Sequence, residues 1–214
     1  MPLYGGRDNN SLTYTSFPCG NAFYAGTIGV ATTEGGQPYS DTLRNGATHK
    51  YMIWVVEGMN SPSRPSGDTA AQWGDAQGQK AFSVANSGRW QHTYDFIWLD
   101  IEKGNYWNSS SSAYSSNVSI INNFIQQFTS NSWNCGIYSG PSLWSSITGD
   151  ATIGTTVTGV SATWTSEKCL TSKTCPTTMS SAQSFGGTTP TWWQYTEDVC
   201  SSTADFDVGT SLPS

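Results

Sequence analysis

The chain has 214 residues, a net charge of −6 and only 11% charged residues, while 31 serines and 27 threonines supply much of its polarity. Its 13% aromatic content excludes a disordered chain, which would be rich in charge and poor in aromatic residues. The nine Lys and Arg residues are scattered along the sequence, and this argues against a nucleic-acid partner.

Strand and helix patterns alternate along most of the chain. Runs of apolar, β-branched and aromatic residues predict buried strands at 23–30, 50–56, 95–102, 135–139, 159–164, 191–195 and 204–208, after a short possible first strand near residues 4–9. Apolar residues three and four apart predict a helix over 117–128, and weaker patterns predict helices over 68–84 and 41–48. Residues 171–189 have a loop-like composition. A single α/β domain over residues 1–214 follows, either a parallel barrel or a doubly wound sheet.

Composition also bears on the compartment. A surface of Ser, Thr, Asn and Gly is typical of secreted proteins, and no apolar run reaches the 18 residues of a membrane span. The first residues lack the pattern of a signal peptide, so we expect a mature chain with an added Met1. The five cysteines lack zinc-site spacing. Cys169 and Cys175 are the best candidates for a disulfide because they enclose a short loop, and Cys135 is the candidate for a buried free thiol.

The sharpest candidate for chemistry is the segment from Asp95 to Gly104. In a strand, residues two apart point the same way, so Trp98, Asp100 and Glu102 share one face. Two neighbouring carboxyls at the end of an apolar strand repel each other and are partly desolvated, which raises the pKa of one of them. One group can then donate a proton near neutral pH while the other stays ionised, as glycosidic bond cleavage requires. The competing interpretation is an Asp100 turn cap and a surface pair between Glu102 and a basic residue.

Further carboxylates follow other predicted strands. Asp8 follows the first, Glu34 the second, and Asp205 and Asp207 flank the last. Each alone is an ordinary loop residue, but together they place carboxylates on one rim of a barrel. Other chemistry is poorly supported, since the sequence has no G-x-S-x-G elbow, no P-loop, no dinucleotide-binding glycine motif and no calcium-loop spacing.

Several motifs together resemble the glycoside hydrolase family 25 lysozymes, in particular the amoeba and nematode type. The resemblance rests on D-I-E at 100–102, G-I-Y-S at 136–139, W-Q-Y at 193–195 and the Asp205 that follows, in that order. It is closest between residues 94 and 144. It implies an irregular TIM-like barrel, about (β/α)5 followed by three β-strands. It also implies a secreted or lysosomal and phagosomal hydrolase that cleaves the β-1,4 bond between N-acetylmuramic acid and N-acetylglucosamine in bacterial peptidoglycan.

The resemblance also implies roles for individual residues. Glu102 would be the general acid, Asp100 would stabilise the transition state or an intermediate, and Asp8 and Asp205 would complete the set of carboxylates. Tyr138 would line the sugar site. We further expect sugar contacts from Glu34 and from three tryptophans, Trp98, Trp164 and Trp193. No metal or cofactor is implied; the partner would be cell-wall glycan, and the protein a monomer with an antimicrobial or digestive role.

Three departures from the family pattern motivate an alternative function. Ala31 stands where a Lys often precedes the A-T-E-G motif, Ile53–Val56 replaces Y-H-F, and Ala162–Thr165 replaces L-W-x-A-x-Y. The alternative is a non-hydrolytic glycan-binding or structural protein on the same barrel.

Overall fold

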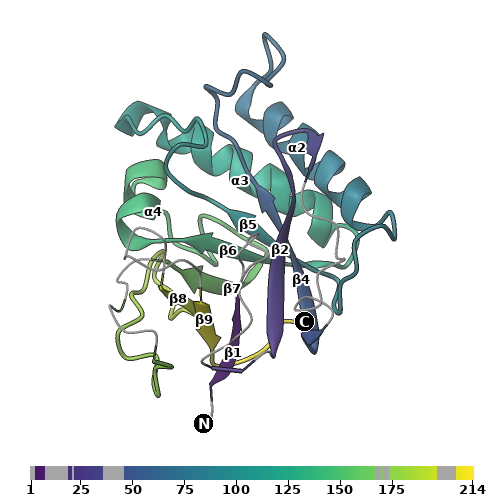
Figure 1. The fold of residues 1–214 in the computed structure, drawn as a ribbon. Coiled ribbons are helices and arrows are strands. Elements are labelled where there is room, and N and C mark those ends of the chain that lie inside the picture. The colour runs from purple at the N-terminus through teal and green to yellow at the C-terminus, as the bar shows by residue number, and fades with distance from the viewer. Residues whose placement is uncertain are drawn as a thin grey trace.

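The computed structural model describes residues 3–7, 19–20, 22–35, 46–166, 170, 174–196 and 206–214. These residues form one mixed sheet of nine strands, flanked by three α-helices and a 3₁₀ turn (Figure 1). The predicted α/β architecture, an irregular barrel with plain strands at its end, is confirmed. Asp8, Cys169, Cys200, Asp205 and most of the helix predicted over 41–48 lie outside the described residues.

Strand–helix alternation occupies the centre of the chain. Strand β4 (His49–Val55) leads to α2 (Ala70–Ala85), β5 (Phe96–Asp100) to η1 (Ser111–Ala113) and α3 (Tyr114–Thr129), and β6 (Asn134–Ser139) to α4 (Pro141–Thr148). Helix α4 was not predicted. Its signals are a proline in the first turn and Gly149, which ends it in the left-handed conformation with φ 66°.

The remaining strands close the sheet. They are β1 (Tyr4–Arg7), β2 (Phe23–Val30), β3 (Thr33–Glu34), β7 (Val160–Thr165), β8 (Trp192–Thr196) and β9 (Phe206–Gly209). Neighbours pair in the order β1-β9-β8-β7-β6-β5-β4-β2-β3, and an additional parallel pairing of β1 with β2 closes the ring. Strand β9 is antiparallel to both of its neighbours, whereas β2, β4, β5, β6, β7 and β8 run parallel, so their carboxyl ends meet at one rim.

Alternate residues of the strands build two separate cores. Ile97, Leu99 and Ile101 of the β5 segment pack outward with the residues of the helices, as predicted. Phe96 and Trp98 face inward, into a cluster that fills the barrel. The other members of that cluster are Phe23, Ala25, Tyr51, Ile53, Tyr138, Ala162, Trp164 and Trp192. The barrel is therefore a packed aromatic core and not an open channel.

One glycine makes room for the largest of these rings. A Cβ on Gly136 of β6 would lie 2.3 Å from the Trp98 ring, much closer than atoms can approach. Trp98 in turn packs against Trp164, with ring centroids 5.4 Å apart, and against Trp192, at 4.9 Å. Gly136 thus fixes the position of Trp98, which lies two residues before Asp100 on the same face of β5.

The disulfide differs from the predicted one. Cys175 is bonded to Cys19, 156 residues away, so the predicted pairing of Cys169 with Cys175 is wrong. The reason is tertiary: both cysteines pack on a small cluster of Trp193, Tyr195, Phe206 and Val208 on β8 and β9, and this brings distant segments together. Short spacing along the chain was a poorer guide than this shared apolar surface. Cys135 is a buried free thiol, as predicted.

Substituting Gly136 tests how tightly the barrel interior is packed. We expect Gly136→Ala to lower the free energy of unfolding by about 1–3 kcal/mol, because the added methyl group must displace Trp98. The control is Gly35→Ala, since nothing lies within 4 Å of a Cβ at that position. Urea unfolding measures both, and equal stability of the two variants would contradict this description of the core.

Candidate active site

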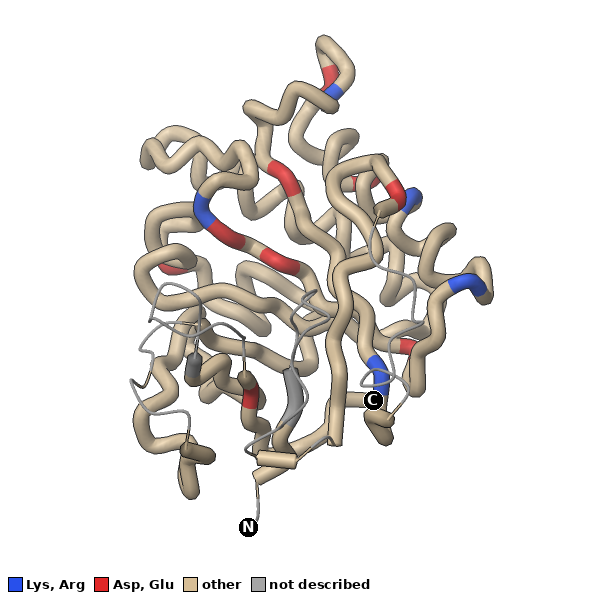
Figure 2. The backbone as a smooth tube through the Cα atoms, viewed as in Figure 1, with Lys and Arg blue, Asp and Glu red and all other residues tan. Residues whose placement is uncertain are grey.

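Asp100 and Glu102 stand at the carboxyl end of β5, on the inward side of the strand. Figure 2 shows how sparse charge is in the chain and how two acidic positions follow one another at the end of β5. The backbone there is held from both sides. Val56 N–H donates to the Asp100 carbonyl at 3.2 Å, and Ile101 N–H donates to the Tyr138 carbonyl at 2.9 Å. The Ser139 hydroxyl donates to the Ile101 carbonyl at 2.9 Å. The backbone that carries the two carboxyls is therefore hydrogen-bonded to the neighbouring strands on both sides.

The environment of this pair disfavours ionisation. Burial, and secondarily the charge of Glu102, raises the pKa of Asp100 well above its ordinary value. Asp100 Oδ1 is buried, and no described residue donates a hydrogen bond to it. Burial also raises the pKa of Glu102, although a hydrogen bond with Tyr138 offsets part of that rise. The pair can thus hold a proton at pH values where ordinary carboxyls have lost theirs.

Tyr138 connects Glu102 with the far side of the barrel. It lies on β6, paired in register with Asp100, and is 8% exposed. Besides its bond with Glu102, its hydroxyl donates to Gln194 Oε1 on β8. Gln194 is paired with Asp207 of β9, whose Oδ1 accepts from the Trp164 indole at 3.0 Å. Asp100, Glu102, Tyr138, Gln194 and Asp207 thus belong to the inward face of one rim.

A third carboxylate lies on the neighbouring strand end. Val55 of β4 is paired with Asp100, and Glu57 follows Val55 by two residues, as Glu102 follows Asp100. Glu57 is 8% exposed, and its Oε2 accepts from the Ser61 hydroxyl at 2.5 Å. The amide of Gln77 on α2 binds the Glu57 backbone twice, at 2.8 and 3.0 Å. Helix α2 therefore holds this strand end in place.

The loops after β4 and β5 also contact each other. Gly58 N–H donates to the Asn105 carbonyl at 2.8 Å, and Asn60 N–H donates to the Tyr106 carbonyl at 3.2 Å. A Cβ on Gly58 would lie 2.6 Å from Trp107 Cα, so the approach requires glycine. Tyr106 has φ 58° and is 46% exposed, four residues after Glu102. A tyrosine in this left-handed conformation is strained by about 1–2 kcal/mol, and its aromatic side chain is exposed to solvent.

The other residues expected to contact sugar do not lie together around the carboxyl pair. Trp98 and Trp164 are fully buried inside the barrel and Trp193 is 1% exposed on its outer side, so the sugar contacts expected of these rings stay a prediction that would require the rings to become exposed. Their size was needed to fill space between strands. Glu34 lies on β3, where it accepts from the exposed Arg89 at 2.6 Å; no described contact joins it to Asp100 or Glu102.

The sequence alone did not lead us to assign a catalytic or binding role to three polar side chains of the rim. Glu57 follows the apolar pair Val55–Val56, in the same way that Glu102 follows its strand. Gln194 lies between Trp193 and Tyr195, and Asp207 between Phe206 and Val208. A polar residue between two aromatic or apolar neighbours in a strand is the available signal, because it marks the inward face of a barrel strand.

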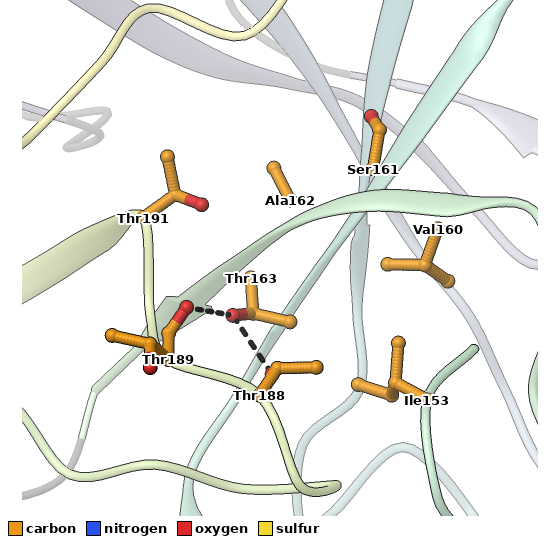
Figure 3. Close-up of a pocket in the computed structure, with 8 residues that line it drawn as sticks. All are labelled: Ile153, Val160, Ser161, Ala162, Thr163, Thr188, Thr189 and Thr191. Atoms are coloured by element: carbon orange, nitrogen blue, oxygen red, sulfur yellow. Dashed lines mark hydrogen bonds between the residues drawn. The ribbon is translucent and has the colours of Figure 1, made fainter.

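A separate pocket beside β7 has different chemistry. It has a volume of ≈ 90 Å³ and is lined by Ile153 and residues of the segments 160–163 and 188–191 (Figure 3). The Thr163 hydroxyl in it is bonded to Thr188 at 3.2 Å and to the Thr189 carbonyl at 3.4 Å. No acidic or basic side chain lines it. It offers no group that could transfer a proton, and the carboxyl pair remains the candidate catalytic site.

A closed α/β barrel with paired carboxyls at the carboxyl ends of its strands is the arrangement of many glycoside hydrolases. Residues 36–198 match the family Lys-1, lysozyme-like protein 1, so the chain belongs to this lysozyme-like family. A search of curated proteins gave no match. No helix among the described residues is long and apolar enough to cross a membrane.

Two solved structures share the fold. One is the modular Cpl-1 endolysin, in a mutant form complexed with a peptidoglycan analogue, with a TM-score of 0.56 and 14% identity. The other is the multimodular pneumococcal cell-wall endolysin from phage Cp-1 complexed with choline, with a TM-score of 0.50 and 13% identity. In each case 88% of this chain aligns with 47% of the other, so the chain spans about half the length of these endolysins. The match confirms the barrel of glycoside hydrolase family 25 type.

The raised pKa of Asp100 predicts a stability that depends on pH. Below the ordinary carboxyl pKa, Asp100 is protonated in both the folded and the unfolded chain, so its burial does not lower the free energy of unfolding through ionisation. As the pH rises past that value the unfolded chain ionises first, and native stability falls until the folded pKa is passed. We therefore expect Asp100→Asn to raise the free energy of unfolding at pH 7 by about 1–2 kcal/mol, and to change it little near pH 3.

Denaturant unfolding at the two pH values measures this effect. Asp68→Asn is the control, because Asp68 lies in the loop before α2, away from the pair. If Asp100→Asn destabilised the protein equally at both pH values, a native Asp100 with an elevated pKa would be contradicted.

Proposed function

We propose that this protein is a secreted lysozyme that hydrolyses the β-1,4 bond between N-acetylmuramic acid and N-acetylglucosamine in bacterial peptidoglycan. The observation that carries the proposal is the half-buried Asp100 and Glu102 pair, with both pKa values raised, at the rim of a lysozyme-family barrel. The peptidoglycan analogue bound by the Cpl-1 endolysin, which shares the fold, supports the choice of substrate. The Cys19–Cys175 disulfide supports an oxidising, extracellular location.

In this proposal Glu102 is the general acid. It is half-buried, so it can reach a sugar on the rim, and burial favours its protonated form. Proton transfer to the glycosidic oxygen would let the bond break. The positive charge that develops on the sugar would lower the pKa of Asp100, which burial raises in the free protein, and the ionised Asp100 would in turn stabilise that charge. The carboxyl pair thus supplies the two forms, one protonated and one charged, that glycoside cleavage needs.

Replacing Glu102 tests the assigned reaction. We expect Glu102→Gln to lower the rate of reducing-end release from purified peptidoglycan by about 10²–10⁴-fold, because the amide cannot donate the catalytic proton. Asp95→Asn is the control, since that carboxylate is exposed beside His92 before the start of β5 and should keep full activity. Equal release by Glu102→Gln and wild type would refute the role. Glycan binding without any release by wild type would favour a non-hydrolytic glycan-binding protein.

The exposed Tyr106 ring is the sugar contact that we propose in place of the buried tryptophans. A pyranose has an apolar face that matches an aromatic ring, Tyr106 is exposed, and strained backbone of this kind is frequent at ligand-binding sites. We expect Tyr106→Ala to weaken binding of peptidoglycan fragments to the Glu102→Gln protein by about tenfold. Tyr4→Ala is the control, because Tyr4 is also exposed, at 41%, but lies at the start of β1. Unchanged binding in Tyr106→Ala would contradict this subsite.

A further inference from the structure

The sequence contains three acceptor motifs for N-linked glycans, in which an asparagine is followed two residues later by serine or threonine. They begin at Asn9, Asn108 and Asn117. Because so short a motif also arises by chance, the surroundings of each asparagine decide whether it can carry a sugar. Asn9 lies outside the described residues. Asn108 and Asn117 are described, and their surroundings are opposite.

Asn117 has no room for a glycan in the folded chain. It lies in the first turn of α3 and is 0% exposed. Its Nδ2 donates to the Asn108 carbonyl at 2.8 Å and to the Ile147 carbonyl at 2.7 Å. An N-linked sugar replaces one of the two hydrogens of a side-chain amide, and both hydrogens of Asn117 are already engaged. A sugar there would break a buried hydrogen bond and displace packed atoms.

Asn108 is exposed in the loop between β5 and η1. Its Oδ1 accepts from the Ser110 N–H at 3.0 Å, whereas no described residue accepts a hydrogen bond from its Nδ2. Ser110, whose hydroxyl completes the acceptor motif, is exposed as well. The amide nitrogen that a sugar would occupy is therefore open to solvent, on a surface loop of the kind that carries such glycans.

The loop is held in place by groups that a glycan would not disturb. Trp107, the preceding residue, packs against the core beneath the helices. The Asn108 backbone carbonyl is bound by the buried Asn117 amide. The side chain of Asn108 takes part in neither contact, so a sugar on it would extend into solvent without a cost in packing.

We propose that Asn108 carries an N-linked glycan when the chain passes through a eukaryotic secretory pathway, and that Asn117 stays unmodified in the folded protein. The inference rests on the secreted location in the proposed function, but not on catalytic activity. The donor is an oligosaccharide joined to a lipid diphosphate, which that pathway supplies together with its transferase. A bond forms between Asn108 Nδ2 and the first sugar carbon, and the bond from that carbon to the diphosphate oxygen breaks. The lipid diphosphate leaves, and the amide loses one hydrogen as a proton.

The test is to secrete the full chain from eukaryotic cells behind a cleavable signal peptide and to map its glycans by peptide mass spectrometry. Enzymatic removal of an N-linked glycan converts the asparagine that carried it to aspartate, which marks the position. We expect this conversion at position 108 and none at position 117.

Two neighbouring serines provide a matched pair of variants. Ser110→Ala removes the hydroxyl that completes the motif but keeps the N–H that binds Asn108 Oδ1, and we expect it to abolish the glycan at position 108. Ser109→Ala is the control, because Ser109 is equally exposed but occupies the middle position of the motif, where any residue except proline is accepted. It should keep the glycan occupancy of wild type.

A secreted wild-type protein without a glycan at position 108 would overturn the proposal. So would a glycan at position 117 in protein that still unfolds cooperatively in urea. Because mass spectrometry needs no activity, the result is separable from the proposed function. A secreted protein that carries the glycan but releases no reducing ends would refute the lysozyme activity and leave the Asn108 site standing.

Discussion

The mutual repulsion of two carboxyls, held together at the end of one strand, is the constraint on which the site depends. Asp100 is the last residue of β5 and Glu102 follows it by two residues, so the chain keeps the two carboxyls close together. Backbone bonds to β4 and β6 fix that strand end. The structure thus maintains an arrangement that costs stability, as catalytic sites commonly do.

Packing of the aromatic interior offsets the stability that the carboxyl pair costs. Trp98, Trp164 and Trp192 pack against one another below the carboxyls and keep water out of the barrel. Exclusion of water raises the pKa of the pair, and it also strengthens the bonds of Tyr138 and Gln194 that orient Glu102. The tryptophans therefore set the environment of the carboxyls.

Local pattern was sufficient to predict most of the fold. Alternation in 96–102 correctly separated the outward Ile97, Leu99 and Ile101 from the inward Trp98, and the plain strands at the end of the chain were recognised. What failed depended on contacts between distant segments. The Cys19–Cys175 bond is set by a cluster on β8 and β9, and the burial of Trp164 and Trp193 by the curvature that closes the sheet.

The site could be predicted only in part for the same reason. Asp100 and Glu102 are two residues apart at the end of β5, so their proximity is a property of the sequence. Glu57, Gln194 and Asp207 join the same rim only through the register of β4, β8 and β9, which periodicity along the chain does not determine. Single polar residues in otherwise apolar strands were the available clue.

A structure of the Glu102→Gln protein with a peptidoglycan tetrasaccharide would show directly whether the carboxyl pair acts on the glycan. We predict that the sugar chain crosses the rim with a glycosidic oxygen about 3 Å from the side chain at position 102, and with Asp100 beneath the adjoining ring. A tetrasaccharide bound elsewhere on the barrel, with no sugar oxygen near position 102, would contradict it.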